Sequence, residues 1–431
     1  MAPRDRLPLS LHVYQRATRL FAPFAGALLA SRLRRGKEDP ERISERRGIA
    51  TLERPAGPLI WAHGASVGEV LSLLPLVERM RPLGFPMLLT SGTVTAAQLV
   101  ERRPSNGTLH QFIPLDVPAF IGRFLDHWRP SLALLAESEL WPNLVIETTR
   151  RGTPLVLVNA RLSQRSFDRW RLARGAMGNL LSHIDLCLAQ GAEDARRLTE
   201  LGAPRVNITG NLKFDVPPPP ADATALSALM RAIGERVVLL AASTHAGEEK
   251  AVLMAHQQIK RRVPGLLTII APRHPERGPE IVDLAQDAGL APVMRSRGHL
   301  PDRGSDIYVA DTIGELGIFY RLAPIVFMGG SLVPHGGQNP IEPAKLDSAI
   351  LYGPHVANFV EIYDQLSRAR GAALVRDADS LARSISLLLE DQALSRKMAV
   401  AARATVENLG GALDRTYASI EPYLIGLKLQ N

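Results

Sequence analysis

Short apolar runs alternate with longer amphipathic stretches along most of the chain. In the first half, runs of aliphatic and β-branched residues recur at regular intervals: 59–62, 87–90, 109–113, 132–136, 154–158, 184–189 and 205–209. Stretches with apolar residues at helical spacing lie between most of them, for example 69–81, 94–103 and 193–201. Alternating strands and helices of this kind predict βαβ units and a mostly parallel sheet.

The pattern breaks near the middle of the chain, where four prolines follow Val216. Consecutive prolines cannot continue a helix or a central strand, so they form a stiff extended spacer. Beyond the spacer the pattern resumes, with strand-like runs at 236–241, 266–271, 306–309, 324–328 and 349–352. Helical stretches in this half include 247–262, 277–288 and most of 379–428.

These patterns predict an α/β protein with two Rossmann-like, doubly wound domains that face a cleft. The expected segments are a basic and apolar N-terminal segment at 1–50, a first domain at 51–215, a proline linker at 216–221 and a second domain at 222–431. Two such domains suit an enzyme that joins two different substrates, and this architecture is usual among nucleotide-sugar glycosyltransferases.

The N-terminal segment contains the apolar run 20–30, with Arg16 and Arg19 before it and Arg32 and Arg34 after it. The run is shorter than the roughly 20 residues that a transmembrane helix needs. Basic residues directly after the run oppose translocation, which argues against a signal peptide. We therefore expect a membrane-associating helix on the cytoplasmic face, and an ordinary helix packed on the first domain is the alternative.

The charge of the chain is unevenly placed. Its 431 residues carry a formal net charge of +8, and residues 1–55 contain 12 Lys and Arg against 6 Asp and Glu. A basic surface can meet nucleic acid, an anionic membrane or an acidic ligand. Nucleic acid is the weakest choice, because the seven Tyr and eleven Phe are not interleaved with the basic clusters. The single cysteine, Cys187, lies in an apolar run and indicates a buried thiol in a reducing compartment.

The loop from His63 to Glu69 lies between a strand-like run and a helical stretch. Loops at the carboxyl ends of strands bind ligands in open α/β sheets, so Glu69 is a candidate for the chemical centre. The spacing Ser66-x-x-Glu69 also fits a capping box, in which Glu69 would only complete the start of a helix. Local evidence leaves both interpretations open.

A glycine-rich stretch, 329–343, follows another strand-like run. Glycines let the backbone approach a ligand closely, and free N–H groups at the next helix start favour a phosphate. Asn339 is expected to cap that helix, with Pro340 at its first position and Glu342 as the capping-box partner. Glu342 could instead accept hydrogen bonds from a ribose, and the stretch could equally be only a well-capped connection.

Charged residues close other strand-like runs. Arg273 could bind a phosphate through two hydrogen bonds, whereas His274 at the same turn is more typical of a structural role. Lys213, at the end of the first domain, could neutralise a departing phosphate or be a solvated surface charge. Glu137 and Glu139 together suggest a metal or acid–base site, although one of them could cap the next helix.

Other motifs of known chemistry are absent from the sequence or have simpler explanations. Asp377-Ala378-Asp379 superficially matches a metal-binding Asp-x-Asp motif, but it opens a terminal helix, so we expect an N-cap and no metal site. The chain has no Cys/His cluster, no P-loop and no Gly-x-Ser-x-Gly elbow. These absences argue against zinc hydrolases, kinases and α/β-hydrolases.

Taken together, the motifs resemble those of the Kdo (3-deoxy-D-manno-octulosonic acid) transferases of lipopolysaccharide biosynthesis, which have the GT-B fold. The likeness spans nearly the whole chain and is carried by Gly64–Glu69, Glu137–Asn143, Asn159–Ser163, Gly210–Asp215, Ser243–His245, Pro272–Arg277, Gly329–Glu342 and Gly353–His355. The resemblance implies an inverting enzyme that moves Kdo from CMP-Kdo to a lipid A precursor (lipid IVA) without a metal or other cofactor. It also implies a location at the cytoplasmic face of the inner membrane.

The resemblance further implies roles for single residues. Glu69 is expected to be the general base, and Glu137 and Lys213 to support the transition state. The CMP part of the donor is expected to be held by Pro272, Arg273, Ile313, Gly314, Glu315, Asn339, Pro340, Ile341 and Glu342. An inverting transfer needs one carboxylate near the attacking hydroxyl and cations near the leaving phosphate, which agrees with these roles. Glu69, at a helix N-terminus, is expected to stay ionised.

Two alternatives to the transferase remain. A GT-B-like nucleotide-sugar epimerase would use the same two domains without a lipid acceptor, and a non-catalytic protein could have kept the fold to bind a membrane or a nucleotide. The basic and apolar N-terminus favours the transferase over the epimerase. The presence of Glu69, Glu137 and Lys213 together favours an enzyme over the non-catalytic protein.

Overall fold

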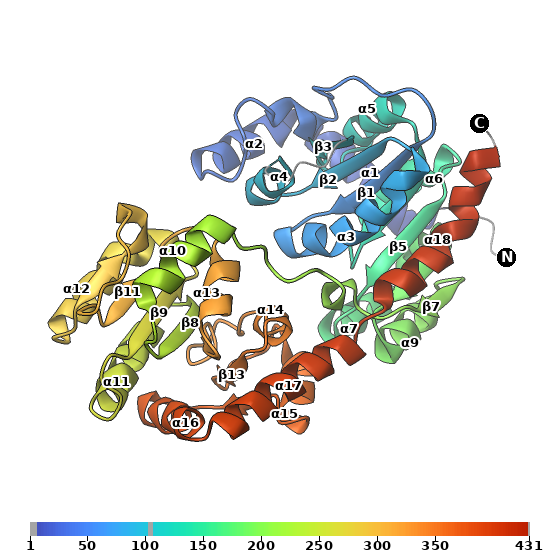
Figure 1. Cartoon of the computed structure of the whole chain (residues 1–431). Coiled ribbons are helices and arrows are strands. Elements are labelled where there is room, and N and C mark those ends of the chain that lie inside the picture. The colour runs from blue at the N-terminus through green and yellow to red at the C-terminus, as the bar shows by residue number, and fades with distance from the viewer. Residues whose placement is uncertain (1–6, 102–106, 430–431) are drawn as a thin grey trace. The chain divides into compact units, whose positions relative to one another are not determined.

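The computed structural model describes residues 7–101 and 107–429. The chain divides into two compact units (Figure 1), which we call the first unit, 1–216 with 409–431, and the second unit, 217–408. The division after Val216 lies at the start of the four prolines. Each unit contains its own parallel sheet, as the alternating pattern predicts.

The sheet of the first unit has seven parallel strands in the order β3-β2-β1-β4-β5-β6-β7. Their bounds are β1 Leu59–Gly64, β2 Met87–Ser91, β3 Thr108–Phe112, β4 Pro130–Ala136, β5 Leu155–Ala160, β6 Leu186–Ala189 and β7 Val206–Ile208. Each strand overlaps one of the seven predicted runs. The strand order reverses between β1 and β4, and open α/β sheets bind ligands at such a switch point. Glu69, in the first turn of the helix after β1, and Glu137, directly after β4, lie next to this switch point in sequence.

Helices cover both faces of this sheet: α3 Val67–Met80, α4 Val94–Glu101, α5 Pro118–Trp128, α6 Pro142–Arg150, α7 Gln164–Leu172, α8 Arg174–Ser182 and α9 Ala192–Glu200. One apolar cluster joins the strands to α5, α6 and α8 and includes the buried rings of Trp61, Phe124 and Trp128. A second cluster joins the other face to α3 and α4. The last two residues of the predicted helix 94–103 lie outside the described residues.

The C-terminal part of the chain contains α16 Ala378–Glu390, α17 Gln392–Asn408 and α18 Ala412–Leu429. The expected second domain, 222–431, is wrong at its end, because α18 belongs to the first unit. Ile420, Leu424 and Leu427 pack in the same apolar cluster as α3 and β1. The Asp215 carboxylate also accepts hydrogen bonds from the N–H groups of Gly411 and Leu413, both at 2.7 Å.

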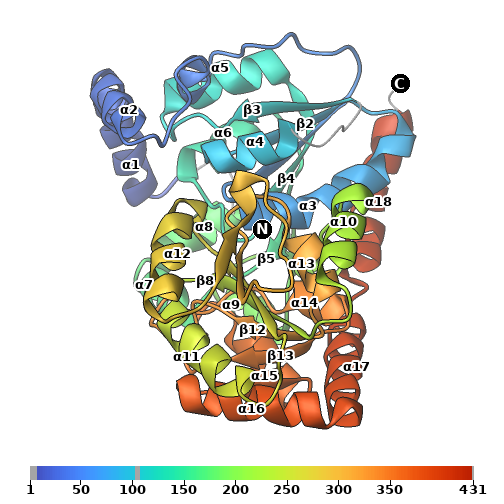
Figure 2. The ribbon, with the colours of Figure 1, turned by 60° about the vertical axis from the view of Figure 1, so that its left-hand side comes forward.

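The second unit has a parallel sheet in the order β10-β11-β9-β8-β12-β13-β14. Figure 2 labels β8, β12 and β13 of this sheet. Its strands are β8 Val238–Thr244, β9 Leu267–Pro272, β10 Pro292–Met294, β11 Ile307–Val309, β12 Ile325–Met328, β13 Ala349–Tyr352 and β14 Ala372–Leu374. Its other helices are α10 Ala223–Ile233, α11 Glu248–Lys260, α12 Gly278–Asp287, α13 Leu316–Leu322, α14 Ile341–Lys345 and α15 Val360–Arg368. The carboxyl ends of β11, β9, β8 and β12 are neighbours and carry the predicted donor-binding segments.

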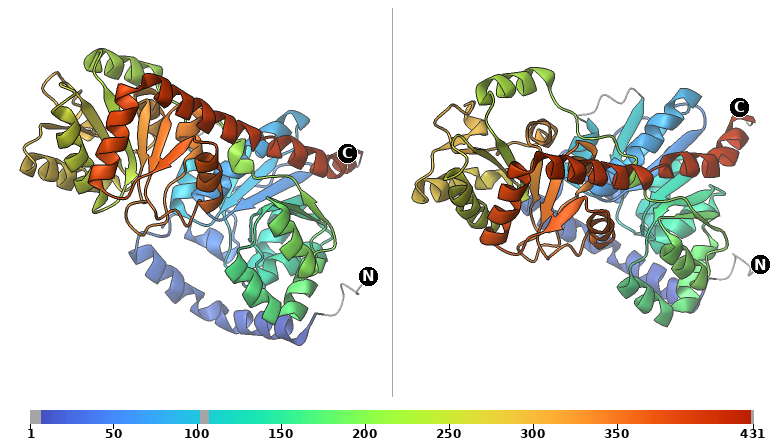
Figure 3. Two further views of the ribbon diagram at one scale, coloured as in Figure 1. Left: turned by 90° about the horizontal axis from the view of Figure 1, so that it is seen from below. Right: turned by 60° about the horizontal axis from the view of Figure 1, so that its bottom comes forward.

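The N-terminal segment forms α1 Leu9–Phe21 and α2 Ala25–Arg34, joined by a 3₁₀ turn at Ala22–Phe24 (Figure 3). One side of it packs on the first unit: Leu11 lies in the core, Ala25 packs against Phe120, and the Tyr14 hydroxyl donates to Asp116. The other side exposes apolar side chains: Leu9, Val13, Leu20, Phe21, Phe24 and Leu28. Within residues 7–101 and 107–429, no helix is both long and apolar enough to cross a membrane.

Candidate active site

Glu69 lies in the first turn of α3, directly after β1. Its carboxylate accepts hydrogen bonds from the Ala65 N–H at 2.8 Å and from the Ser66 hydroxyl at 2.7 Å, and the Ser66 oxygen caps the helix. Gly64 allows this close turn, because a Cβ on it would lie 3.0 Å from the Glu69 Cβ. Ser66 therefore caps α3 as expected, but the reciprocal capping box does not form, because the Glu69 carboxylate accepts the N–H of Ala65 and not that of Ser66.

Burial raises the pKa of Glu69, and the charges of Glu139 and Glu137 raise it further. The hydrogen bonds from Ser66 and Ala65 lower it, but the net pKa is raised. We expected Glu69 to stay ionised at the helix N-terminus; desolvation and the neighbouring carboxylates act in the opposite direction and raise its pKa. A carboxylate with a raised pKa has a higher proton affinity, which suits a general base. The cap and the base are thus compatible roles for the same side chain.

Glu137 and Lys213 form an ion pair, with 2.5 Å between Nζ and Oε1. Glu137 directly follows β4 and has a left-handed φ of 52°, which is uncommon for a residue other than glycine. Lys213 lies on a 3₁₀ turn whose Leu212 N–H donates to the buried Asn159 Oδ1 at 2.9 Å. The structure therefore brings together the three residues predicted to be catalytic, because the charge of Glu137 also acts on Glu69.

A second pair of titratable side chains, His63 and Glu139, lies at the same edge of the sheet and had no predicted role as a pair. His63 is fully buried, and its Nε2 lies 3.6 Å from Oε2 of Glu139. Burial raises the pKa of Glu139, but contacts with His63 and Trp141 outweigh it and hold that pKa below the usual range. Glu139 does not cap the next helix, since the Asp116 carboxylate accepts the first N–H groups of α6. The two residues are far apart in sequence, so local pattern could not reveal the pair.

The predicted donor-binding residues of the second unit lie at the carboxyl ends of its strands. Pro272 ends β9, and the exposed Arg273 follows it, with its N–H donating to the Thr244 carbonyl at 2.9 Å. Burial raises the pKa of Glu342, whereas Asn339 and the charge of Arg273 lower it. Arg273 and Glu342 are thus close enough for their charges to interact.

The predicted capping box at Asn339 is wrong in its details. The short helix α14 begins at Ile341, after Pro340, and contains only five residues. Asn339 Oδ1 accepts the Ile341 N–H at 3.1 Å, and its amide donates to Glu342 Oε1 at 3.4 Å. The Glu342 carboxylate therefore contacts the side chain of Asn339 and not its backbone, so the reciprocal box does not form.

The segment Ile313-Gly314-Glu315 follows β11. The Ile313 side chain is 74% exposed, and Gly314 has a left-handed φ of 87°. Glu315 forms a two-pronged ion pair with Arg295 at 2.6 and 3.1 Å, and this pair holds the pKa of Glu315 below its usual range. Arg295 already pairs with the Glu315 carboxylate. The side chain of this segment that remains exposed to a ligand is therefore Ile313.

Three imidazoles meet beside Arg273. The His245 ring stacks on His335 with 4.3 Å between centroids, and His274 lies edge-on at 5.9 Å. Burial, followed by the positive charges of these neighbours, lowers the pKa of His245 to about 4. His245 is therefore neutral near pH 7. His245 and His335 had no predicted role, although both lie in segments that carry the family resemblance, Ser243–His245 and Gly329–Glu342.

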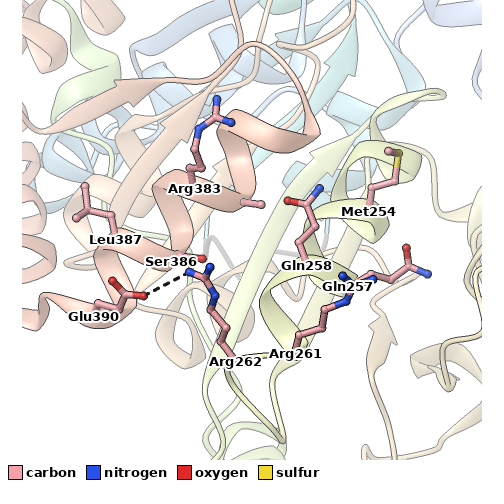
Figure 4. Close-up of a pocket in the computed structure, with 10 residues that line it drawn as sticks. Met254, Gln257, Gln258, Arg261, Arg262, Arg383, Ser386, Leu387 and Glu390 are labelled. Atoms are coloured by element: carbon pink, nitrogen blue, oxygen red, sulfur yellow. Dashed lines mark ion pairs between the residues drawn. The ribbon is translucent and has the colours of Figure 1, made fainter.

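One hollow of the second unit lies away from these residues. It is a groove of about 780 Å³ between α11 and α16 (Figure 4), lined by Arg261, Arg262 and Arg383 among others. None of the predicted site residues lines it. In the described parts of the chain, no group of three or more His, Cys, Asp or Glu side chains is placed to hold a metal ion.

Comparisons with known proteins agree on one family. Residues 41–216 match the profile of the family described as 3-deoxy-D-manno-octulosonic-acid transferase. The chain is 34% identical over 401 residues to the 3-deoxy-D-manno-octulosonic acid transferase of Haemophilus influenzae, covering 89% of this chain and 92% of that protein. It is 35% identical over 425 residues to the enzyme of that name from Bordetella pertussis, covering 96% and 99%.

Solved structures share the fold at low sequence identity. A glycosyltransferase from Rickettsia africae matches with a TM-score of 0.57 at 12% identity, covering 86% of this chain and 98% of that chain. A UDP-N-acetylglucosamine 2-epimerase, described as putative, from Listeria monocytogenes matches with 0.54 at 15%, covering 85% and 96%. These likenesses support the predicted GT-B type of α/β fold, and they do not separate a transferase from an epimerase.

Proposed function

The chain belongs to the family of 3-deoxy-D-manno-octulosonic-acid (Kdo) transferases, and we propose that it moves Kdo from CMP-Kdo to a phosphorylated lipid A precursor, lipid IVA. It is a glycosyltransferase, so what is proposed is the donor, the acceptor and the mechanism. The observation that carries the mechanism is the first-unit cluster, in which a capped carboxylate of raised pKa, Glu69, lies near the Glu137–Lys213 ion pair.

The proposed reaction is a single displacement that inverts the anomeric centre. Glu69 takes the proton of the acceptor hydroxyl while that oxygen attacks the anomeric carbon of Kdo. The bond from this carbon to the phosphate oxygen breaks, and CMP leaves with the electron pair. Lys213, held by Glu137 at 2.5 Å, supplies a fixed positive charge that stabilises the negative charge of the transition state.

The donor would bind at the strand ends of the second unit. Arg273 is exposed and has a guanidinium suited to the CMP phosphate. Glu342 would accept a hydrogen bond from the ribose, and Ile313, 74% exposed, would pack on the cytosine ring. Pro272, Gly314, Asn339, Pro340 and Ile341 would shape the backbone around the nucleotide.

The N-terminal helices suit a membrane surface that carries the acceptor. Leu9, Val13 and Leu20 of α1 are between 57% and 79% exposed, and basic residues of the same segment would face anionic lipid. We therefore place the enzyme at the cytoplasmic face of the inner membrane. Leu20→Ser together with Phe24→Ser should weaken sedimentation with anionic vesicles, and unchanged sedimentation would contradict this placement.

The decisive experiment is incubation of the purified chain with CMP-Kdo and lipid IVA, run both without and with EDTA. The expected result is CMP release together with a rise in acceptor mass by whole Kdo units. Absence of both CMP release and the mass shift would overturn the proposed donor and acceptor. Loss of transfer only on adding EDTA would overturn the metal independence while leaving the substrates in place.

A further inference from the structure

Glu248, the first residue of α11, is a fully buried carboxylate with no part in the mechanism above. Four backbone N–H groups donate to it. One belongs to His245, in the loop after β8, at 2.9 Å. The others belong to Gly330 at 2.6 Å, Ser331 at 2.9 Å and Leu332 at 2.8 Å, in the glycine-rich loop after β12. One side chain therefore ties two loops that are more than 80 residues apart in sequence.

The number of donors explains why a carboxylate is needed at this position. A buried charge is costly unless hydrogen bonds or opposite charges compensate it. Two carboxylate oxygens provide about four acceptor positions, which match the four N–H groups here. The N-terminus of α11 adds a favourable dipole. A glycine-rich loop could offer its N–H groups to a phosphate. Here the N–H groups of residues 330–332 already donate to the Glu248 carboxylate.

The two loops are also in close backbone contact. Ser243 has a left-handed φ of 56°, and the register of β8 against β9 shifts between Ala242 and Thr244. A Cβ on Gly329 would lie 2.4 Å from the Ser243 carbonyl oxygen, so only glycine fits there. Glu248 bonds to the residues on either side of this contact and fixes how the two loops meet.

The side chains that the two loops present depend on this arrangement. His245 comes from the first loop, but its ring stacks on His335 and its Nε2 lies 3.1 Å from Gln338 Nε2, both in the second loop. The Gly337 N–H donates to the Gly330 carbonyl at 2.7 Å, so the part of the loop before Asn339 is anchored on the part that Glu248 holds. A change at Glu248 would therefore reach the donor-binding segment without touching the donor.

We propose that Glu248 is a positioning residue of the donor site, which holds His245 and the glycine-rich loop in the arrangement that receives the nucleotide. The inference rests on the proposed function, because it takes these strand ends as the place where CMP-Kdo binds.

Glu248→Gln tests this role while keeping the size of the side chain. The amide nitrogen of glutamine cannot accept a hydrogen bond, so some of the four N–H groups lose their acceptor. The Kd for CMP, measured by calorimetry, should rise by about tenfold or more, and the KM for CMP-Kdo with it. The KM for the lipid acceptor should stay within about twofold, because that substrate is bound elsewhere. Glu248→Asp keeps the charge on a shorter stem and should recover part of the CMP affinity.

Asp306→Asn is the matched control. Asp306 is also buried in the second unit, but it precedes β11 at the opposite end of the sheet, where it accepts the Ala291 N–H at 3.0 Å and pairs with Lys260 at 2.5 Å. Its substitution should lower the melting temperature and leave the Kd for CMP unchanged. A merely structural role for Glu248 would make the two variants behave alike.

The outcomes separate the two proposals. If the wild-type chain binds CMP and Glu248→Gln binds it equally well, the positioning role is wrong and the proposed function stands. Equal losses of CMP affinity in Glu248→Gln and Asp306→Asn would also overturn the positioning role. If the wild-type chain binds neither CMP nor CMP-Kdo, the proposed function itself fails. Should Glu248→Gln not fold, an unchanged Kd for Glu248→Asp would overturn the positioning role.

Discussion

The two sheets of this protein have similar topology and opposite chemistry at their carboxyl ends. The first unit presents three carboxylates, Glu69, Glu137 and Glu139. Lys213 forms an ion pair with one of them, Glu137. The second presents Arg273 and three imidazoles, and its carboxylate Glu315 is bound by Arg295. One edge is therefore suited to accepting a proton and the other to receiving a phosphate, which are the two requirements of an inverting transfer.

Glu69 and Glu248 show how the same group serves different purposes at the two edges. Both lie in the first turn of a helix that follows the first strand of its unit. Glu69 accepts two hydrogen bonds from a half-buried position, so it has remaining capacity to take a proton. Glu248 is fully buried and accepts four. The number of donors around each carboxylate separates the proposed base from the proposed positioning residue.

The largest expected effect comes from Glu69→Gln. Glutamine at this helix position still forms a capping interaction, but it cannot take a proton. The rate of transfer should fall by roughly 10²- to 10⁴-fold, the usual contribution of a general base, while the melting temperature stays nearly unchanged. Steady-state kinetics with a parallel thermal melt measure both. A melt that collapses in proportion to the activity would show that the cap is the only role of Glu69.

Lys213→Met should have the next largest effect, because it removes the cation at the first edge and keeps the apolar stem. We expect kcat to fall by about 10²- to 10³-fold with little change in the Kd for CMP, since the charge acts in the transition state. Rapid-quench measurement of a single turnover isolates this step. A raised Kd for CMP with an unchanged kcat would instead place Lys213 in ground-state donor binding.

Arg273→Ala should weaken the second edge without affecting the first. Loss of a charged hydrogen-bonding group of this kind costs about 1.5–3 kcal/mol, so the Kd for CMP should rise by roughly 10- to 150-fold. Arg262→Ala is the control, because Arg262 lines the groove between α11 and α16 in the same unit (Figure 4). Equal CMP affinities for the two variants would remove Arg273 from the phosphate site.

Much of this arrangement could be predicted from the sequence, because parallel strands of four or more apolar residues leave a clear pattern. The strands β10 and β14 were missed, because each has only three residues and so little pattern of its own, although the equally short β7 and β11 were predicted. The unit to which α18 belongs was also missed, because an amphipathic pattern shows that a helix packs but not which sheet it packs on. The sequence therefore predicted most of the helices and strands, but not which distant elements they pack against.

The candidate site divides in the same way. Local motifs and the family resemblance brought Glu69, Glu137 and Lys213 to attention, and the structure places them together. The partner of Glu315 and the four donors around Glu248 come from segments that are remote in sequence. Hydrogen bonds between separate loops leave no periodic signal, so sequence could suggest which carboxylates matter but not which of them were already engaged.

The prediction with the smallest expected effect tests most directly how the carboxylates of the first unit act on one another. Contacts with His63 and Trp141 hold the pKa of Glu139 below its usual range, so Glu139 stays charged over the pH range in which Glu69 takes up a proton. That negative charge contributes to the raised pKa of Glu69. A general base acts in its ionised form, so the proposed role of Glu69 predicts that kcat/KM falls as the pH drops through this raised pKa.

Glu139→Gln removes the charge and should therefore lower the pKa of Glu69, which moves the acid limb of the kcat/KM profile to lower pH. Glu147→Gln is the control, because Glu147 pairs with Arg150 and Arg151 on α6 and is not among the charges that act on Glu69. A limb that stays in place, or that moves to higher pH, would mean that Glu139 does not act on the base through its charge. If the acid limb moves to lower pH in Glu139→Gln but not in Glu147→Gln, that limb reports the ionisation of Glu69. Glu139 can shift the profile only by acting on a nearby group that titrates in that pH range.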